Sequence, residues 1–153
     1  MKRLMTLIGF LCISYIPAAV GSQFMPGPWY DSLIKPTWNP PDWVFAPVWT
    51  ILYLMIGIAG YWFWQDGKGK NKIAGYSMYG LQIFLNLLWS PLFFGLKSPG
   101  ASLVDILALF VVIILTVVCF MRVSRRAAYI MAPYGLWVGY ACSLNAALYL
   151  LNR

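Results

Sequence analysis

Long apolar runs make up most of the chain, and short polar or basic stretches separate them. A helix needs about 20 mainly apolar residues to cross the hydrocarbon core of a bilayer. Five runs have this character, at residues 4–24, 43–64, 73–95, 102–121 and 127–151. The pattern predicts an all-α integral membrane protein. Residues 1–153 would form a single transmembrane domain, a five-helix bundle with a long structured loop between the first two helices.

The first run has a second interpretation. Lys2, Arg3 and the later sequence Ala19-Val20-Gly21 are typical of a secretory signal peptide and its cleavage site. However, the apolar run continues to Phe24, which favours a retained helix. Cleavage would leave four spans.

Composition supports a membrane location and removes several kinds of catalytic site. Hydrophobic residues make up 61% of the chain and charged residues 10%, whereas a soluble domain carries about 25% charged residues. The absence of histidine excludes histidine-based acid–base catalysis, Ser-His-Asp triads and histidine-ligated zinc or haem. The four acidic residues are too scattered for a carboxylate metal cage. We therefore expect no conventional catalytic residues and no metal site.

The net charge of +7 comes from basic clusters beside the apolar runs. Such clusters are typical of topology signals in membrane proteins and argue against nucleic-acid binding. Eight basic residues belong to the N-terminus and to the loops after the second and fourth runs: Lys2, Arg3, Lys68, Lys70, Lys72, Arg122, Arg125 and Arg126. Three lie on the opposite side: Lys35, Lys97 and Arg153. For a bacterial cell membrane this predicts a cytoplasmic N-terminus, an external C-terminus and an external first loop.

The first loop, residues 25–42, leads into a segment rich in proline and tryptophan. Between positions 29 and 49 the chain holds Pro36, Pro40, Pro41 and Pro47, together with Trp29, Trp38, Trp43 and Trp49. Tryptophan at a membrane surface often forms only an interfacial belt. Proline fixes the backbone angle φ, so the alternation favours a preformed lid over a cavity.

Polar residues recur on one face of the third run and of the fifth. Gln82, Asn86, Trp89 and Phe93 share one helical face, and Tyr134, Trp137, Ala141 and Asn145 share another. Polar side chains within a bilayer point inward. There they serve either as hydrogen bonds between helices or as a pocket wall that orients a ligand, and the spacing leaves both open.

Three smaller features have structural interpretations. Gly135 and Gly139 form a GxxxG sequence, which gives weak support for a dimer. Asp105 follows Ser102 in an S-x-x-D pattern at the start of the fourth run, which favours helix capping over a proton relay. The cysteines all lie within apolar runs, where we expect them to pack as small hydrophobic residues: Cys12, Cys119 and Cys142.

Four motifs in order along the chain resemble those of the tryptophan-rich sensory protein / translocator protein family, which includes the peripheral-type benzodiazepine receptors. They are WY at 29–30, KPxWxPPxWxFxPVWxxLY at 35–53, QxxLNxxWSPxFF at 82–94 and PYxxWxxxAxxLN at 133–145. The resemblance spans residues 21–145. It implies a five-helix bundle, usually a homodimer, with a ligand cavity between the helices under the first loop.

The resemblance also implies what the cavity binds. Members of this family bind porphyrins and haem, as ligands rather than as obligatory cofactors, and mitochondrial members also bind sterols and synthetic isoquinoline or benzodiazepine-type compounds. By motif match the ligand-binding residues would be Trp38, Trp43, Trp49, Tyr53, Tyr61, Asn86, Trp89, Trp137 and Ala141. The mitochondrial sterol motif has a tyrosine after the LN pair, where this chain has Ala146. This departure argues against sterol binding, although Leu144, Tyr149 and Arg153 satisfy the loose sterol pattern.

Together these features favour a membrane tetrapyrrole-binding protein that acts as a sensor, carrier or scavenger of porphyrins. The alternative is an enzyme that degrades porphyrin in light through tryptophan chemistry, as some bacterial relatives are reported to do. An ion-coupled transporter is disfavoured, because transporters place ionisable groups at mid-membrane and only Asp105 comes near.

Overall fold

The computed structural model describes residues 1–67 and 72–153, and within these ranges the chain contains helices and no strands. The all-α prediction is therefore confirmed. Lys68 and Lys70, which contribute to the predicted charge asymmetry, lie outside the described residues. The elements are α1 (Lys2–Gly21), α2 (Pro28–Ser32), η1 (Asp42–Val44), α3 (Phe45–Asp66), α4 (Ile73–Ser90), η2 (Pro91–Gly95), α5 (Pro99–Met121), α6 (Arg125–Ile130) and α7 (Ala132–Leu151).

Within the described residues, three segments are long and apolar enough to cross a membrane: α1, α5 and the segment Asp42–Asp66, which contains η1 and α3. They correspond to the predicted runs at 4–24, 43–64 and 102–121. Helices α4 and α7, with 18 and 20 residues, are long enough, but by mean hydropathy they are less apolar than these three segments. The count of five spans therefore stays a prediction.

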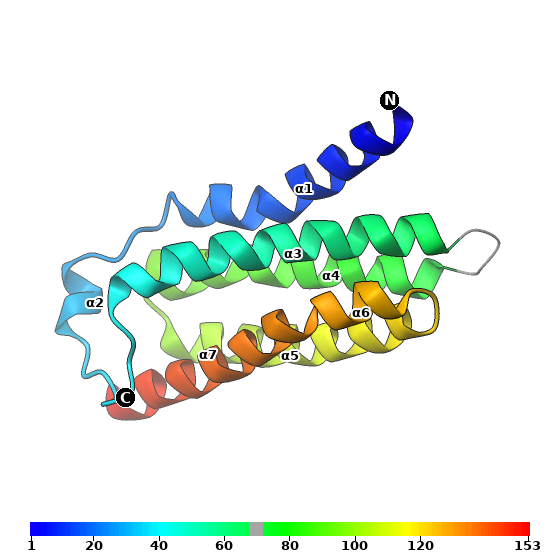
Figure 1. Ribbon diagram of the computed structural model, residues 1–153. Coiled ribbons are helices and arrows are strands. Elements are labelled where there is room, and N and C mark those ends of the chain that lie inside the picture. The colour runs from blue at the N-terminus through cyan, green and yellow to red at the C-terminus, as the bar shows by residue number, and fades with distance from the viewer. Residues whose placement is uncertain (68–71) are drawn as a thin grey trace.

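The long helices lie side by side along one axis (Figure 1). Helix α1 packs against α3 and α4, α4 packs against α5, and α5 packs against α7, while the short α6 contacts both α3 and α5. The two termini lie at opposite ends of the bundle, and the loop that contains α2 covers the end near the C-terminus (Figure 1).

The predicted run at 127–151 is divided into α6 and α7, and the break lies at Met131. Pro133 occupies the first turn of α7. Proline has no N–H to donate to the preceding turn, so one continuous helix would lose a hydrogen bond at this position. The chain instead begins a new helix whose first turn accommodates the proline.

The capping interpretation of Asp105 is wrong. Helix α5 begins at Pro99, three residues before the predicted start, and its N-cap is Ser98, whose hydroxyl accepts a hydrogen bond from the Ala101 N–H at 3.3 Å. Serine followed by proline is a favoured helix start. Asp105 lies beyond the first turn and is 7% exposed, and its Oδ2 is buried without a hydrogen-bond partner.

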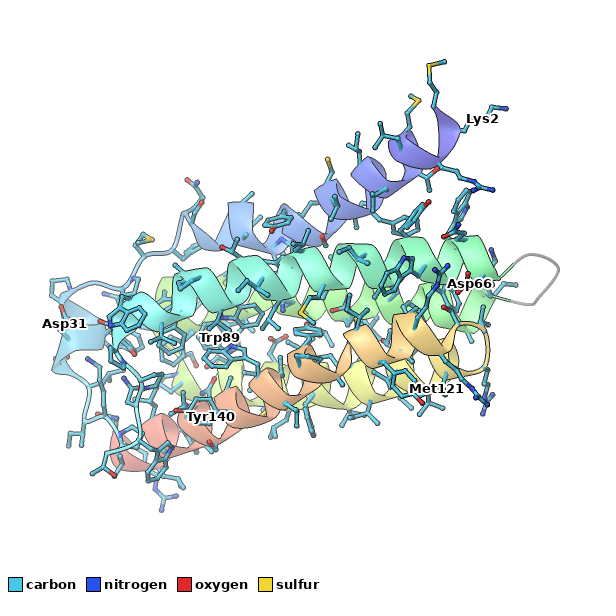
Figure 2. All side chains as sticks on the ribbon, in the orientation of Figure 1. Lys2, Asp31, Asp66, Trp89, Met121 and Tyr140 are labelled. Atoms are coloured by element: carbon cyan, nitrogen blue, oxygen red, sulfur yellow. The ribbon has the colours of Figure 1, made fainter. Side chains whose placement is uncertain are left out.

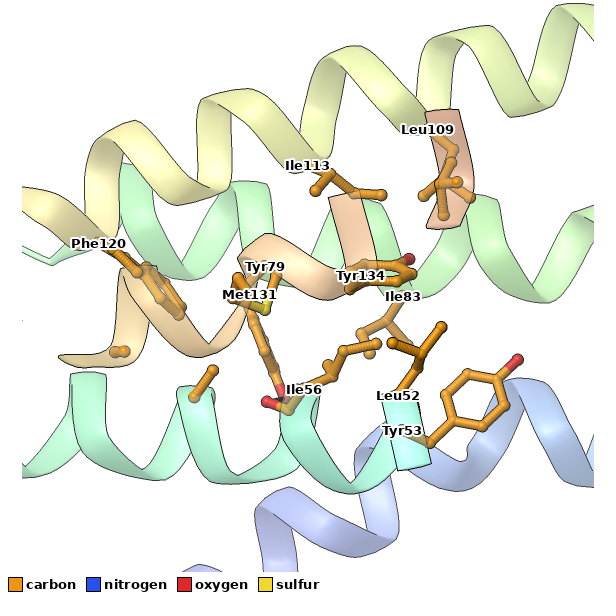
Figure 3. Packing of buried hydrophobic residues seen from close by; sticks show 14 of the residues in the cluster. Leu52, Tyr53, Ile56, Tyr79, Ile83, Leu109, Ile113, Phe120, Met131 and Tyr134 are labelled. Carbon is orange, nitrogen blue, oxygen red and sulfur yellow. Dashed lines mark hydrogen bonds between the residues drawn. The ribbon is translucent and has the colours of Figure 1, made fainter. Parts of the chain in front are cut away.

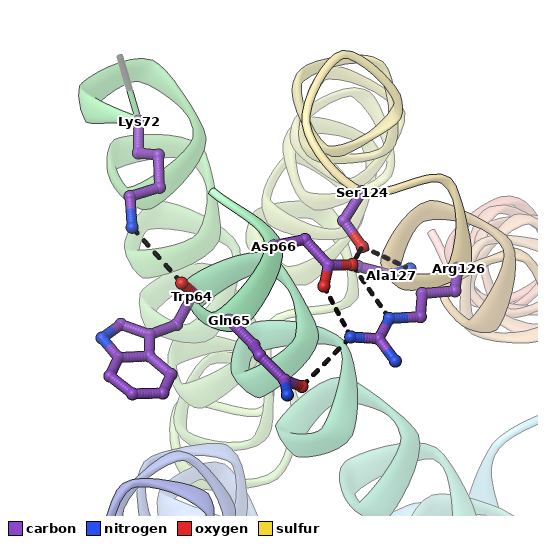
Figure 4. Close-up of polar contacts among 7 residues, drawn as sticks. All are labelled: Trp64, Gln65, Asp66, Lys72, Ser124, Arg126 and Ala127. Atoms are coloured by element: carbon purple, nitrogen blue, oxygen red, sulfur yellow. Dashed lines mark hydrogen bonds and ion pairs between the residues drawn. The ribbon is translucent and has the colours of Figure 1, made fainter. Parts of the chain in front are cut away.

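A polar cluster joins α3 to α6 (Figure 4). It lies at the end of the bundle opposite α2, where Figure 2 labels Asp66. Arg126 forms an ion pair with Asp66 across 2.5 Å, and the Ser124 hydroxyl donates to the same carboxylate. The Arg126 guanidinium also lies 5.1 Å from the centre of the Trp62 ring. In contrast, α3 makes few contacts with α7. Helices α3 and α7 therefore touch each other at few points, and α6 provides most of the connection between them at this end.

Aromatic rings fill the core near this polar cluster. The Phe63 ring stacks on Phe120 with centroids 4.1 Å apart, and the Tyr79 ring stacks on the same phenylalanine. Ile56, Ile113 and other buried side chains continue the core along the bundle (Figure 3).

Glycines set how closely the helices approach one another. A Cβ on Gly57 of α3 would lie 3.0 Å from the Leu11 Cα of α1. The backbones of α1 and α3 therefore approach each other closely at this point. Gly139 faces Phe110 of α5, and Gly135 faces Ile113. The GxxxG sequence thus serves packing within the chain and does not support a dimer.

Candidate ligand cavity

A cavity of about 510 Å³ lies inside the bundle at the end covered by the α2 loop. Its wall comes from α1, α3, α4 with η2, α5 and α7, and residues of the loop that contains α2 line its end. The volume falls within the range of about 300–1,000 Å³ that is typical of small-molecule sites. Residues of both α3 and α7 line it, among them Trp49 and Trp137.

Aromatic rings form most of the flat surfaces of the cavity. Trp49 stacks on Tyr53 of the next turn, with ring centroids 5.3 Å apart and planes at 28°. From the opposite helices, Trp89 stacks on Phe93 at 4.9 Å and 10°, and Trp137 lies edge-on to Phe45. A planar ligand in this cavity would therefore meet aromatic side chains from α3, α4 and α7.

One tryptophan is linked to two other helices through a single asparagine. Trp89 projects from α4 into the interior of the bundle (Figure 2), and its indole Nε1–H donates to Asn145 Oδ1 at 3.0 Å. Asn145 Nδ2 in turn donates to the Pro99 carbonyl at 2.9 Å. This arrangement joins α4, α7 and α5 and sets the plane of the Trp89 ring.

A chain of buried hydrogen bonds runs from the cavity into the core. The Tyr53 hydroxyl donates to Asn86 Oδ1 at 2.8 Å, and Asn86 Nδ2 donates to the Tyr134 hydroxyl at 2.9 Å. The Tyr134 hydroxyl donates to Gln82 Oε1 at 2.9 Å. Tyr53 and Asn86 line the cavity, whereas Tyr134 and Gln82 are fully buried behind it. The two alternatives for the polar face of α4, hydrogen bonds between helices and a pocket wall, both apply.

Most of the predicted ligand residues lie together around this cavity. Those that line it are Trp49, Tyr53, Asn86, Trp89, Trp137 and Ala141. They come from α3, α4 and α7, as the spacing of the motifs indicated. Their part in ligand binding stays a prediction.

The other three predicted residues do not line the cavity. Trp38 and Trp43 are 54% and 75% exposed, because the loop turns them outward. Tyr61 lies further along α3, where it stacks on Trp64 with ring centroids 6.0 Å apart. Motif matching could not separate these residues from the rest, since it carries no information on the direction of a side chain in a loop.

The loop does form a lid, and two side chains of the C-terminal region hold it in place. The Ile34 N–H donates to Asn152 Oδ1 at 2.8 Å, and Asn152 Nδ2 donates to the Ile34 carbonyl at 3.0 Å. The Tyr140 hydroxyl donates to the Trp38 carbonyl at 2.7 Å. Sequence reasoning missed Asn152 and Tyr140, because nothing in the local pattern connects them to the loop.

Tyr30 is the buried part of the lid. It is 6% exposed, borders the cavity and lies edge-on to Phe93 and Phe94. Burial raises the pKa of its hydroxyl above the usual value of 10.0, and the negative charge of Asp42 raises it further. Lys35 Nζ lies 4.3 Å from the centre of the Tyr30 ring, which places a cation beside a residue that borders the cavity.

The sequence is similar to those of known proteins along nearly its whole length. The profile of the TspO/MBR family matches residues 5–150. Tryptophan-rich protein TspO of Chlorobaculum tepidum is 45% identical, in an alignment that covers 99% of this chain and 98% of that protein. The human translocator protein is 35% identical, covering 95% of this chain and 89% of its own. The tryptophan-rich sensory protein of Cereibacter sphaeroides is 34% identical, covering 94% and 89%. This chain belongs to the TspO/MBR family.

Proposed function

We propose that this protein binds tetrapyrroles, porphyrin or haem, in the cavity under the α2 loop and acts as a sensor, carrier or scavenger of porphyrins. The observation that carries the proposal is that three tryptophans from three helices, Trp49, Trp89 and Trp137, line one cavity of about 510 Å³. A flat aromatic ligand gains both area burial and ring stacking from such a wall.

The polar groups at the cavity suit the remaining parts of a porphyrin. The propionates carry negative charge, and Lys35 provides a cation beside Tyr30, which borders the cavity. The chain has no histidine to ligate haem iron. Tyrosine is another haem ligand in proteins, but the Tyr53 hydroxyl is already bound to Asn86. We therefore expect metal-free porphyrin to bind about as well as haem.

The same cavity would admit other planar compounds, including synthetic isoquinoline or benzodiazepine-type ligands. The names of the relatives, which include translocator protein and tryptophan-rich sensory protein, are compatible with either a carrier or a sensor.

We infer that α4 and α7 also span the membrane, which gives five spans, and that the protein is a multi-pass protein of the bacterial cell membrane. The N-terminus would be cytoplasmic, and the protein would form a homodimer.

Quenching of tryptophan fluorescence tests the proposal directly. Purified protein in detergent is titrated with protoporphyrin IX, haem and a sterol. Saturable quenching by both tetrapyrroles, and none by the sterol, is the expected result. Absence of saturable quenching by either tetrapyrrole would show that the cavity serves another ligand.

Illumination of the bound complex separates binding from degradation. Stable binding leaves the porphyrin Soret band unchanged in light. Loss of this band with a defined product, dependent on Trp137, would establish the alternative activity.

Reporter fusions at the two termini test the topology, which requires the two reporters to lie on opposite sides of the membrane. Mass measurement in several mild detergents tests the dimer.

A further inference from the structure

Tyr134 lies directly behind two side chains that face the cavity. Its hydroxyl accepts a hydrogen bond from Asn86, and its ring lies edge-on to Trp49, with centroids 6.3 Å apart and planes at 69°. Tyr134 itself is 0% exposed and does not line the cavity. Tyr134 therefore packs behind the residues that line the cavity, and a ligand would contact Asn86 and Trp49 rather than Tyr134.

The hydrogen bonds of Tyr134 determine how Asn86 is oriented. A tyrosine hydroxyl has one proton to donate, and Tyr134 donates it to Gln82 Oε1. Towards Asn86 the Tyr134 oxygen is therefore an acceptor, so Asn86 presents Nδ2 to it. The Asn86 Oδ1 atom then faces Tyr53, whose hydroxyl donates to it.

This orientation decides what Asn86 offers to a ligand. A carboxamide has two N–H protons and a carbonyl oxygen with two lone pairs. One proton and one lone pair are used within the chain of hydrogen bonds. The second Nδ2 proton remains for an acceptor on the ligand, such as a carboxylate or carbonyl oxygen. Rotation of the amide by a half-turn would exchange these two edges.

We propose that Tyr134 is a positioning residue of the ligand cavity, with Gln82 as its partner: together they fix which edge of the Asn86 carboxamide a ligand meets. The proposal rests on the proposed function, because it concerns how a tetrapyrrole is bound. Without the Tyr134 hydroxyl, the Asn86 amide loses the bond that fixes its orientation, and Trp49 keeps its contact with the ring.

The Tyr134→Phe variant removes the hydroxyl and retains the ring. We expect its affinity for protoporphyrin IX to fall by about 3- to 10-fold, the range for one neutral hydrogen bond. Tyr79→Phe is the matched control. Tyr79 is also buried, its hydroxyl donates to the Ile56 carbonyl at 3.2 Å, and it does not line the cavity. Equal affinities for the two variants would overturn the proposal.

A double-mutant cycle shows whether the hydroxyl acts through Asn86. Tyr134→Phe is combined with Asn86→Ala, and protoporphyrin IX affinity is measured for all four proteins. If Tyr134 positions Asn86, its hydroxyl has no effect on affinity once the amide is gone. Multiplicative losses would show that the hydroxyl acts independently, and the positioning role would be wrong.

A ligand-free measurement separates failure of this proposal from failure of the proposed function. We expect the side-chain ¹⁵N–H signals of Asn86 to shift in Tyr134→Phe and to stay in place in Tyr79→Phe. Gln82→Leu, which removes the acceptor of the Tyr134 proton, should shift the same signals and serves if Tyr134→Phe does not fold. Unchanged Asn86 signals in these variants would overturn the positioning role. Shifted signals without porphyrin binding by the wild type would support it and refute only the proposed ligand.

Discussion

The Asn152 side chain holds the backbone of Ile34 at both its N–H and its carbonyl, with distances of 2.8 and 3.0 Å. Asn152 Nδ2 also donates to the Leu148 carbonyl at 2.8 Å, which fixes the amide to the last turn of α7. The lid of the cavity is thus fastened to the C-terminal end of the protein. Ligand exchange through this end requires the fastening to open or the loop to deform around it.

Replacement of Asn152 should therefore loosen the lid. We expect Asn152→Ala to increase amide hydrogen exchange at Ile34 and to accelerate porphyrin dissociation by about 3- to 10-fold, as for loss of one or two exposed hydrogen bonds. Exchange mass spectrometry and stopped-flow fluorescence measure these effects. Ser143→Ala is the control, because this hydroxyl bonds only to the Tyr140 carbonyl of its own helix. Unchanged dissociation in Asn152→Ala would exclude a role in the lid.

Replacement of Trp137 tests whether the ligand binds in the cavity. Stacking of a nucleobase on an aromatic side chain is worth about 1–3 kcal/mol, and on that scale Trp137→Ala should weaken porphyrin binding by roughly 5- to 150-fold. Trp64→Ala is the control, because Trp64 stacks on Tyr61 away from the cavity. Fluorescence titration measures both. Equal losses, or none in either variant, would mean that the ligand binds elsewhere.

Gly57 tests the close contact of α1 with α3. A Cβ there would lie 2.8 Å from the Ser14 hydroxyl and 3.0 Å from the Leu11 Cα, and a backbone atom cannot rotate away. We expect Gly57→Ala to destabilise the protein by about 1–3 kcal/mol through overpacking. Gly80→Ala has open space around its Cβ and should be neutral or stabilising by up to about 1 kcal/mol, from helix propensity. Thermal unfolding in detergent compares the two, and a more stable Gly57→Ala would contradict the structure.

The lid should weaken at high pH. The pKa of Tyr30 is raised in the folded protein, first by burial and then by Asp42, so its neutral form contributes stability that is complete below the ordinary value of 10.0. This contribution is lost as the pH rises from that value through the folded pKa. We expect Tyr30→Phe to lose less stability than the wild type over that interval. Asp42→Asn should lower the Tyr30 pKa, which an ultraviolet titration of the phenolate would record. Identical alkaline titrations of all three proteins would rule out this coupling.

Helix positions could be predicted because they depend on local pattern. Apolar runs of sufficient length identified α1, α3 and α5, and helical periodicity placed Asn86 with Trp89, and Trp137 with Ala141, on inward faces. All four of these residues line the cavity. A period of 3.6 residues decides which side chains share a face, and this needs no knowledge of the partner helix.

The helix caps and the direction of the loop side chains could not be predicted as well from the sequence. The S-x-x-D pattern at Ser102 predicted the start of the fourth helix, but the structure begins α5 three residues earlier, at Pro99, with Ser98 as its N-cap. Asp105 is consequently buried. Trp38 and Trp43 belong to the same motif as Trp49 but turn outward, because the direction of a loop side chain depends on how the whole loop is held.

The amino-acid sequence by itself determined the helical character, the inward faces and the family of this protein, since each is a property of short segments or of their order. Only the tertiary structure decided that Asn152 fastens Ile34, 118 residues away, and that Tyr134 stands between Asn86 and Gln82. Such contacts form when separate helices are brought together. Their hydrogen-bond partners are chosen by distance and direction in space, on which the local pattern carries no information.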